Sequence, residues 1–223
     1  MLSRYRFEKF LKFLSSGGDL FESPSATLLL FATSLFLSRE NRTPRLINFG
    51  GACGESIFLL CKIFEDQIFR TTCVCESAQH VRESSNWDYV SKINISDNLE
   101  KALATPIDIF FTSGTIQYLP NPYEPLDTVA KAGVPIVALT RNNFSLNPTI
   151  VAQRSMLSAN GTGSHLAEYG NFELYYPNSS IDKQKLIKTF LDHGYSLILD
   201  TTGTASGVYG ATSFSGDLVF VKT

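Results

Sequence analysis

The chain has 223 residues, of which 43% are hydrophobic and 18% are charged, so it holds enough apolar material for a core. That composition excludes a disordered, collagen-like or disulfide-scaffold protein. Its 19 basic and 21 acidic residues give a net charge of −2 and form no basic run, so we expect no nucleic-acid partner.

Residues 1–44 predict an N-terminal helical extension, which would form a cap ahead of the main domain. Residues 1–14 have the pattern of an amphipathic helix and lack the apolar region of a signal peptide. A second helix is expected to begin at Ser23 and Pro24, which would serve as capping residue and first-turn proline. The apolar run 28–37 is far shorter than the roughly 20 residues of a membrane span, so we expect no span.

The aromatic residues of these two helices are assigned to the core, with a cap over a ligand cleft or a homodimer surface as alternatives. They are Phe7, Phe10, Phe13, Phe31 and Phe36. All four cysteines lie between Cys53 and Cys75, too close together for a disulfide framework. We therefore expect reduced thiols in a cytoplasmic protein, and no metal site.

From residue 45 onwards the pattern alternates between strands and helices. Strands are expected at 45–49, 71–75, 106–112, 133–140, 195–200 and 218–221, with a weaker segment at 89–95, and helices at 55–69, 97–104, 122–132 and 181–193. This order predicts an α/β fold in which residues 45–223 form a doubly wound, mostly parallel, seven-stranded Rossmann-like sheet. The last two strands are expected to pair as a C-terminal antiparallel hairpin. Residues 141–180 show little periodicity and are expected to be an irregular insertion.

The sharpest local signal is the turn between the first strand and the helix that follows it. Asn48 lies near the end of the strand, and Gly50, Gly51 and Gly54 then turn the chain. The next helix would present its unpaired N–H groups to a ligand at this point. The spacing matches neither a P-loop nor the G-x-G-x-x-G dinucleotide fingerprint. A tight turn without a ligand is the alternative interpretation.

Two further polar positions fall at the same edge of the predicted sheet. Glu76 directly follows the second strand, where a carboxylate can accept both ribose hydroxyls of a nucleoside held by the glycine turn. A solvated charge is the alternative for this residue. A buried strand runs into Thr112, Ser113 and Gly114, which places them at the ligand edge. No G-x-S-x-G elbow is formed, so the sequence gives no support for a hydrolase.

In combination, the GG-x-x-G turn at Gly50–Gly54, Glu76 and the SG-x-x-QYL segment at Ser113–Leu119 resemble a class I S-adenosylmethionine-dependent methyltransferase. More narrowly, the chain resembles a bacterial methyltransferase family associated with surface-polysaccharide gene clusters. This narrower resemblance spans roughly residues 45–222. Its further shared features are Arg141, Thr149–Gln153, Tyr176-Pro177 and Gly194-Tyr195.

The sequence departs from the family pattern at three places. Asn48 stands where the family has Asp, so hydrogen bonding is kept and the charge is lost. Ala52 replaces a glycine of the broader superfamily, and Asn142-Asn143 replace Thr-Pro. These departures motivate an alternative function, a catalytically inactive methyltransferase-like domain for binding or scaffolding. A nucleotide-dependent oxidoreductase is the weakest reading because its motifs are missing.

The resemblance implies a methyltransferase that uses S-adenosyl-L-methionine to methylate a small polar or sugar-linked acceptor in polysaccharide biosynthesis. The cofactor-binding residues that it implies are Asn48, Gly50, Gly51, Gly54, Glu76, Thr112, Ser113 and Gly114. The acceptor-binding candidates are Arg141, Gln153 and Tyr176, and the catalytic candidates are His165 and Tyr118.

Two roles within the 141–180 insertion follow from this assignment. Arg141 would grip a carboxylate or phosphate in bidentate fashion, with a surface ion pair or a loop anchor as the alternative. Residues 155–171 would form a lid over the acceptor, with disorder as the alternative.

Overall fold

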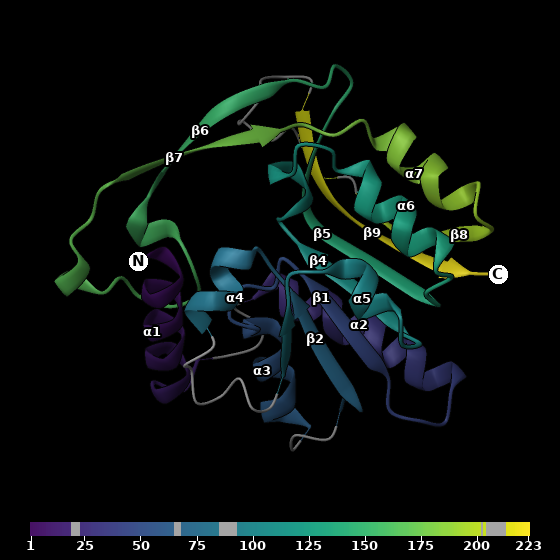
Figure 1. Ribbon diagram of the computed structural model, residues 1–223, viewed down its shortest axis with the longest axis horizontal. Coiled ribbons are helices and arrows are strands. Elements are labelled where there is room, and N and C mark those ends of the chain that lie inside the picture. Colours follow the sequence, from purple (N-terminus) through teal and green to yellow (C-terminus); the bar gives the residue numbers. More distant parts are fainter. Residues whose placement is uncertain (19–22, 65–67, 85–92, 202, 204–212) are drawn as a thin grey trace.

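The computed structural model describes residues 1–18, 23–64, 68–84, 93–201, 203 and 213–223 (Figure 1). Its helices are α1 (Leu2–Ser15), α2 (Pro24–Arg39), α3 (Glu55–Ile63), α4 (Ala78–Ser84), α5 (Leu99–Leu103), α6 (Tyr123–Lys131) and α7 (Lys183–Leu191). Its strands are β1 (Arg45–Phe49), β2 (Thr71–Cys75), β3 (Asn94–Ser96), β4 (Ile109–Ser113), β5 (Ile136–Ser145), β6 (Ile150–Met156), β7 (Glu173–Ser179), β8 (Tyr195–Asp200) and β9 (Ser213–Lys222).

Seven strands form one sheet in the order β3-β2-β1-β4-β5-β9-β8. The first five of these pair in parallel, and β9 runs antiparallel to both β5 and β8. The expected α/β fold, with a mostly parallel Rossmann-like sheet and a C-terminal antiparallel pair, is therefore confirmed. The strand order reverses between β1 and β4, and ligands of such sheets bind there, outside the carboxyl ends of the strands.

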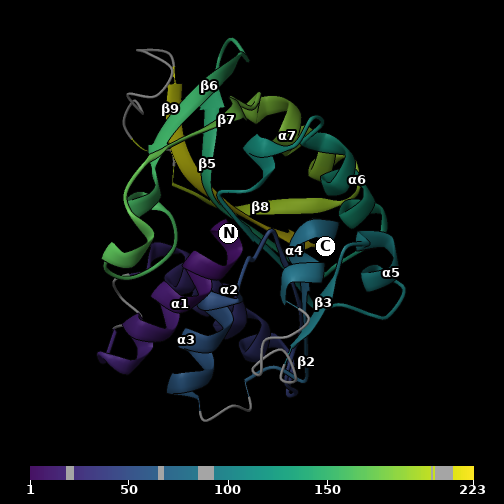
Figure 2. The ribbon, with the colours of Figure 1, turned by 60° about the vertical axis from the view of Figure 1, so that its left-hand side comes forward.

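Helices cover both faces of the sheet because successive strand residues point to opposite sides. Leu46 of β1 packs in an apolar layer that includes residues of α2 and α3, whereas Ile47 packs in a layer with α6 and α7. Figure 2 shows α1, α2 and α3 together on one side of the sheet and α6 and α7 on the other. Phe10, Phe13 and Phe36 are buried in the first layer, as the sequence analysis assigned them.

Most elements lie close to their predicted positions. Ser23 caps α2, since its hydroxyl accepts a hydrogen bond of 3.4 Å from the N–H of Ala26. The helix expected at 55–69 ends at Ile63, and residues 65–67 lie outside the described part of the chain. Of the weak segment expected at 89–95, residues 89–92 also lie outside it, and the rest leads into β3. Phe31 is 42% exposed and does not belong to the core.

The expectation of an irregular insertion at residues 141–180 is wrong. The strand β5 continues to Ser145, and β6 and β7 form an antiparallel ribbon that pairs Ile150 with Ser179 and Met156 with Glu173. Side chains of the ribbon alternate between more exposed and less exposed positions. Polar residues occupy both faces, since Gln153 points toward a polar cavity, and this hides the period of two from a hydrophobicity pattern.

The described residues also bear on membrane, metal and disulfide chemistry. No described helix combines the length and the apolarity that crossing a bilayer requires. None of the four cysteines forms a disulfide. Within the described ranges, no three metal-ligating side chains are grouped together.

Candidate functional site

A cavity of 1280 Å³ opens at the carboxyl ends of the parallel strands. Its walls come from the glycine turn, the ends of β4 and β5, the β6–β7 ribbon, the segment 159–164, and parts of α1 and α2. Ten predicted site residues line it: Asn48, Gly50, Gly51, Glu76, Ser113, Gly114, Tyr118, Arg141, Gln153 and Tyr176. The predicted cofactor residues and the predicted acceptor residues thus face one continuous space.

The glycine turn has no room for side chains at two positions. Gly50 has a φ of +67°, and a Cβ atom added there would overlap the side chain of Thr115. A Cβ atom on Gly51 would overlap the side chain of Asn48. The N–H of Gly50 donates a hydrogen bond of 2.7 Å to the carbonyl of Cys75, which ties the turn to β2. Glycine at both positions therefore lets the side chains of Thr115 and Asn48 pack directly against the turn.

Glu76 is fixed against the same turn by two backbone groups. Its Oε1 accepts a hydrogen bond of 2.8 Å from the N–H of Ala52, and its Oε2 accepts one of 3.1 Å from the N–H of Ser77. Each carboxylate oxygen has a second lone pair, so the group still has acceptor capacity for ligand hydroxyls. Ala52 has a φ of +49°, in the left-handed region that favours glycine. Glycine would adopt this conformation with less strain than Ala52 does.

Asn48 is buried beneath the cavity, with 2% of its surface exposed. Its Oδ1 has no hydrogen-bond partner among the described residues. Buried polar atoms are seldom left unpaired in folded proteins, because the lost hydrogen bond with water is not replaced. The Asn48 oxygen is therefore suited to accept a hydrogen bond from an ammonium or N–H group of a ligand.

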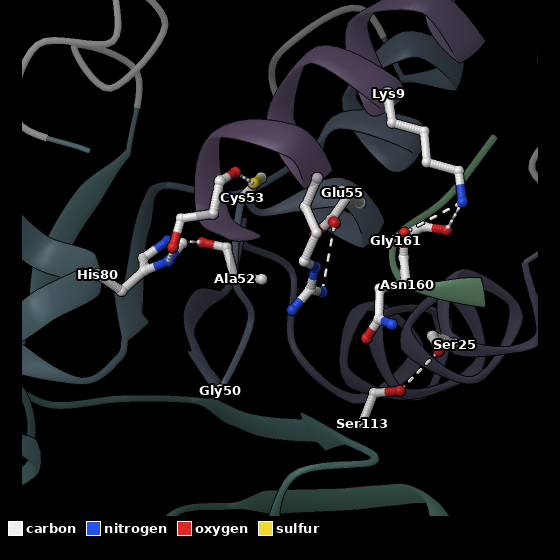
Figure 3. Close-up of polar contacts among 12 residues, drawn as sticks. Lys9, Ser25, Gly50, Ala52, Cys53, Glu55, His80, Ser113, Asn160 and Gly161 are labelled. Carbon is white, nitrogen blue, oxygen red and sulfur yellow. Dashed lines mark hydrogen bonds and ion pairs between the residues drawn. The ribbon is translucent and has the colours of Figure 1, made fainter. Parts of the chain in front are cut away.

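The end of β4 joins the glycine turn to the start of α2. The hydroxyl oxygens of Ser113 and Ser25 lie 2.6 Å apart in a hydrogen bond, which Figure 3 shows. Gly114 has a φ of +58°, and a Cβ atom there would lie 3.6 Å from Cζ of Arg141. The Arg141 guanidinium accordingly lies beside Gly114, which directly follows β4, and it lines the same cavity.

Three predicted acceptor-side residues contact one another across the cavity. The Tyr118 hydroxyl donates a hydrogen bond of 3.2 Å to Oε1 of Gln153, and Nε2 of Gln153 donates one of 3.5 Å to the Tyr176 hydroxyl. The two tyrosine rings meet edge to face, with their centroids 5.3 Å apart. Burial raises the pKa of Tyr118, so this phenol keeps its proton. The cluster therefore presents aromatic surface and hydrogen-bonding groups, and not a phenolate base.

Three predicted site residues lie away from the cavity lining. His165 contacts α1, since its Nδ1 lies 2.9 Å from the Tyr5 hydroxyl. Thr112 is fully buried within β4. Gly54 caps α3 in a left-handed conformation, and a Cβ atom there would lie 3.1 Å from Ile93. The geometry thus gives Gly54 and Thr112 supporting roles and does not support His165 as a base.

Sequence reasoning predicted a cap from residues 1–44 but did not identify the residues of α1 that contact this site. Arg6 lines the cavity and forms an ion pair of 3.5 Å with Glu55 at the start of α3. Ser3 contacts the glycine-turn side, because its hydroxyl lies 3.1 Å from Nδ1 of His80, whose Nε2 lies 2.8 Å from the carbonyl oxygen of Ala52. Charged residues on an amphipathic helix are usually solvated, so the sequence held no signal for these contacts.

The same helix holds residues 157–170, which make up most of the lid predicted at 155–171 and which we call the lid segment. Lys9 is 2% exposed, and its ammonium donates hydrogen bonds of 2.9, 3.0 and 2.9 Å to the carbonyls of Ser158, Asn160 and Gly161. Figure 3 shows Lys9 reaching the chain at Asn160 and Gly161. The Tyr169 hydroxyl also donates a hydrogen bond of 2.6 Å to Glu8 of α1. The lid segment is thus fastened over the cavity by α1.

No protein-family model matches the sequence, and no curated protein sequence matches it. Solved structures do match. DesVI of Streptomyces venezuelae aligns with a TM-score of 0.60 and 13% identity, over 96% of this chain and 96% of its own. The N-terminal domain of EvdMO1 with SAH bound aligns with a TM-score of 0.54 and 11% identity, over 86% of this chain and 79% of its own. An S-adenosylmethionine-dependent methyltransferase from Clostridium acetobutylicum aligns with a TM-score of 0.53 and 9% identity, over 95% of both chains.

These likenesses establish the fold of the chain. It is the Rossmann-like fold that S-adenosylmethionine-dependent methyltransferases such as the Clostridium protein share, as the sequence resemblance implied. Identities of 9–13% do not carry a reaction from one protein to another. The association with surface polysaccharides and the cytoplasmic location stay predictions.

Proposed function

We propose that the chain is an S-adenosylmethionine-dependent methyltransferase that acts on a small polar or sugar-linked acceptor. The observation that carries the proposal is the single cavity shared by the glycine turn with Glu76 and by the cluster of Tyr118, Gln153 and Tyr176. A methyl transfer needs a cofactor and an acceptor side by side in one water-excluding space.

The residues present fit the proposed cofactor. Gly50 and Gly51 line the cavity where the methionyl part would lie, and the unpaired Asn48 oxygen can accept from its ammonium group. Glu76 would accept the ribose hydroxyls, and Ser113 would line the space between cofactor and acceptor. When bound, S-adenosylmethionine supplies an electrophilic methyl group.

The remaining residues would orient the acceptor and exclude water. Tyr118 keeps its proton and would donate or relay a hydrogen bond, so its role is positioning and not proton abstraction. Residues 1–44 would act as a cap, since α1 forms one wall of the cavity and holds the lid segment by Lys9. Catalysis would then rest on alignment of the reacting groups and on exclusion of water.

A catalytically inactive binding domain is the second candidate, and Asn48 is the observation that favours it. A neutral amide at this position holds a cationic ligand group less strongly than a carboxylate does. Cofactor binding without product formation over a broad panel of acceptors would establish this second candidate.

The test of the proposal is calorimetric titration with S-adenosylhomocysteine. We expect the wild type to bind this ligand. The Glu76→Gln variant should lose about 1–3 kcal/mol of binding free energy, which raises Kd roughly 5- to 150-fold. The matched control is Glu173→Gln, which removes an exposed carboxylate of β7 that does not line the cavity. An absence of binding by the folded wild type would overturn the proposal. An equal loss in both variants would overturn the assigned site.

A further inference from the structure

Arg141 is a charged residue of the cavity whose guanidinium forms no ion pair with a described carboxylate. Among the other charged lining residues, Arg6 pairs with Glu55 at 3.5 Å, and Glu76 is held by backbone N–H groups. Lys12 lies on α1, outside the acceptor cluster. No carboxylate contacts the Arg141 guanidinium within the part of the chain that the structure describes.

The backbone of Arg141 is held in a conformation that costs energy. Its φ is +57°, which is uncommon for any residue other than glycine. The pairing of β5 with β9 shifts register between Leu139 and Asn142, so a bulge lies at this residue. Bulges next to ligand sites commonly redirect a side chain away from the regular pleat. Here the bulge directs Arg141 into the cavity.

Three hydrogen bonds keep the bulge in place. Asp217 Oδ1 accepts from the Thr140 hydroxyl at 2.7 Å and from the N–H of Arg141 at 3.1 Å. Nε2 of Gln117 donates a hydrogen bond of 3.1 Å to the carbonyl of Arg141. Strained conformations persist only where the surroundings fix them, and they gather at ligand sites. The contacts fix the main chain, and the guanidinium itself is left for another partner.

We propose that Arg141 binds an oxyanion of the acceptor, so that the substrate class is a small molecule bearing a carboxylate or a phosphate. The inference rests on the proposed function, since it assigns the acceptor half of that site. The guanidinium lies beside Gly114, one of the predicted cofactor residues, so the anionic group is close to the methylated atom. A planar guanidinium pairs with either oxyanion through two parallel hydrogen bonds. The anion also neutralises Arg141 where a cationic cofactor shares the cavity.

The test is a set of titrations with three sugar probes, made with and without saturating S-adenosylhomocysteine. Glucose 1-phosphate and glucuronate carry the two candidate anions, and glucose is the neutral control. We expect at least one anion to bind tenfold or more tightly than glucose, and the stronger of the two identifies the source of the oxyanion. Arg141→Gln should abolish this preference, and Arg141→Lys should keep part of it because it keeps the charge. The matched control is Arg154→Gln, which changes an exposed arginine of β6 that pairs with Glu173.

The outcomes separate this inference from the proposed function. Binding of S-adenosylhomocysteine without any preference for the anions would overturn the inference and leave the methyltransferase proposal intact. An anion preference that depends on Arg141, without S-adenosylhomocysteine binding, would support the anion site and overturn the methyltransferase proposal. A preference that survives in folded Arg141→Gln would overturn the role of Arg141. Circular dichroism of each variant identifies any that does not fold.

Discussion

Lys9 of α1 donates a hydrogen bond of 2.9 Å to the main-chain carbonyl of Gly161, a residue 152 positions away in the sequence. The same ammonium also reaches the carbonyls of Ser158 and Asn160. A buried ammonium with three carbonyl partners has all three of its donors satisfied, which offsets much of the cost of its burial. The contact makes α1 and the lid segment one structural unit.

Replacing Lys9 with Met should destabilise the protein and loosen the lid segment. The substitution leaves three carbonyls without their donor, and we expect the free energy of unfolding to fall by about 1–3 kcal/mol. Urea denaturation measures this change, and hydrogen exchange should rise within residues 157–170. Lys12→Met on the exposed part of the same helix is the control and should change stability by about 0.5 kcal/mol at most. Equal effects of the two substitutions would contradict the role of Lys9.

Gly50→Ala should weaken binding of S-adenosylhomocysteine by at least roughly tenfold, because the new methyl group overlaps Thr115 and displaces the turn. Gly133→Ala is the matched control, since Gly133 has a φ of +69° and open space around its Cα. Both substitutions carry the cost of a left-handed alanine, about 1 kcal/mol. Calorimetry on both variants isolates the steric effect at the turn. Unchanged affinity in Gly50→Ala would show that the ligand does not depend on this backbone.

Arg141→Gly should not lower stability, although it removes the proposed anion ligand. Glycine adopts a φ of +57° without strain, so the substitution removes about 1–2 kcal/mol of backbone strain from the folded state. This gain offsets the entropic cost of folding a more flexible chain. Arg154→Gly lies in the regular strand β6 and should cost about 0.5–1 kcal/mol. Thermal unfolding of the two variants makes the comparison. A larger loss in Arg141→Gly than in Arg154→Gly would mean that Arg141 serves mainly to hold the fold.

Asp108, directly before β4, should contribute stability that is lost in acid. Burial raises the pKa of this carboxyl, but hydrogen bonds from Arg42 of 2.8 and 2.6 Å and from the N–H of Arg45 outweigh burial and hold the pKa below its ordinary value. The folded state therefore releases this proton more readily than the unfolded state does. The contribution is present above the unfolded-state pKa of the carboxyl and is lost as the pH falls through the lower folded-state pKa.

Asp108→Asn tests this contribution. We expect the free energy of unfolding of the variant to be about 2–3 kcal/mol lower at pH 7. Below about pH 4 its stability should decline less steeply than that of the wild type. Urea denaturation across this pH range makes the measurement. Parallel pH profiles of the two proteins would show that Asp108 is not a main source of the acid sensitivity.

The sequence was informative wherever local chemistry determines structure. Continuous apolar runs marked the buried strands β4 and β5, and the glycines marked a turn that has no room for side chains. Tyr118, Arg141, Gln153 and Tyr176 were chosen one by one, and the structure brings all four to one cavity. The end of β4 places Ser113 and Gly114 at the ligand edge, whereas Arg141, Gln153 and Tyr176 lie within β5, β6 and β7 and reach the cavity through tertiary packing.

Other features left no trace in the sequence. Lys9 looked like a solvated charge because its partners are main-chain carbonyls, which every residue possesses. The β6–β7 ribbon carries polar side chains on both faces, so its period was hidden. His165 was chosen for its chemical type alone, and its position beside Tyr5 depends on how α1 packs against the lid segment. Such contacts between distant segments follow from tertiary packing and not from local pattern.

The antiparallel course of β9 has a practical consequence for work with this protein. Because β9 runs against the parallel strands, its last residues lie at the edge of the sheet away from the cavity, next to the start of β8. The opposite end of the described chain leads directly into α1, which forms a wall of the site (Figure 1). A tag, dye or surface attachment placed after Thr223 therefore leaves the ligand cavity undisturbed. One placed before Met1 adds bulk next to α1, the helix that holds the lid segment.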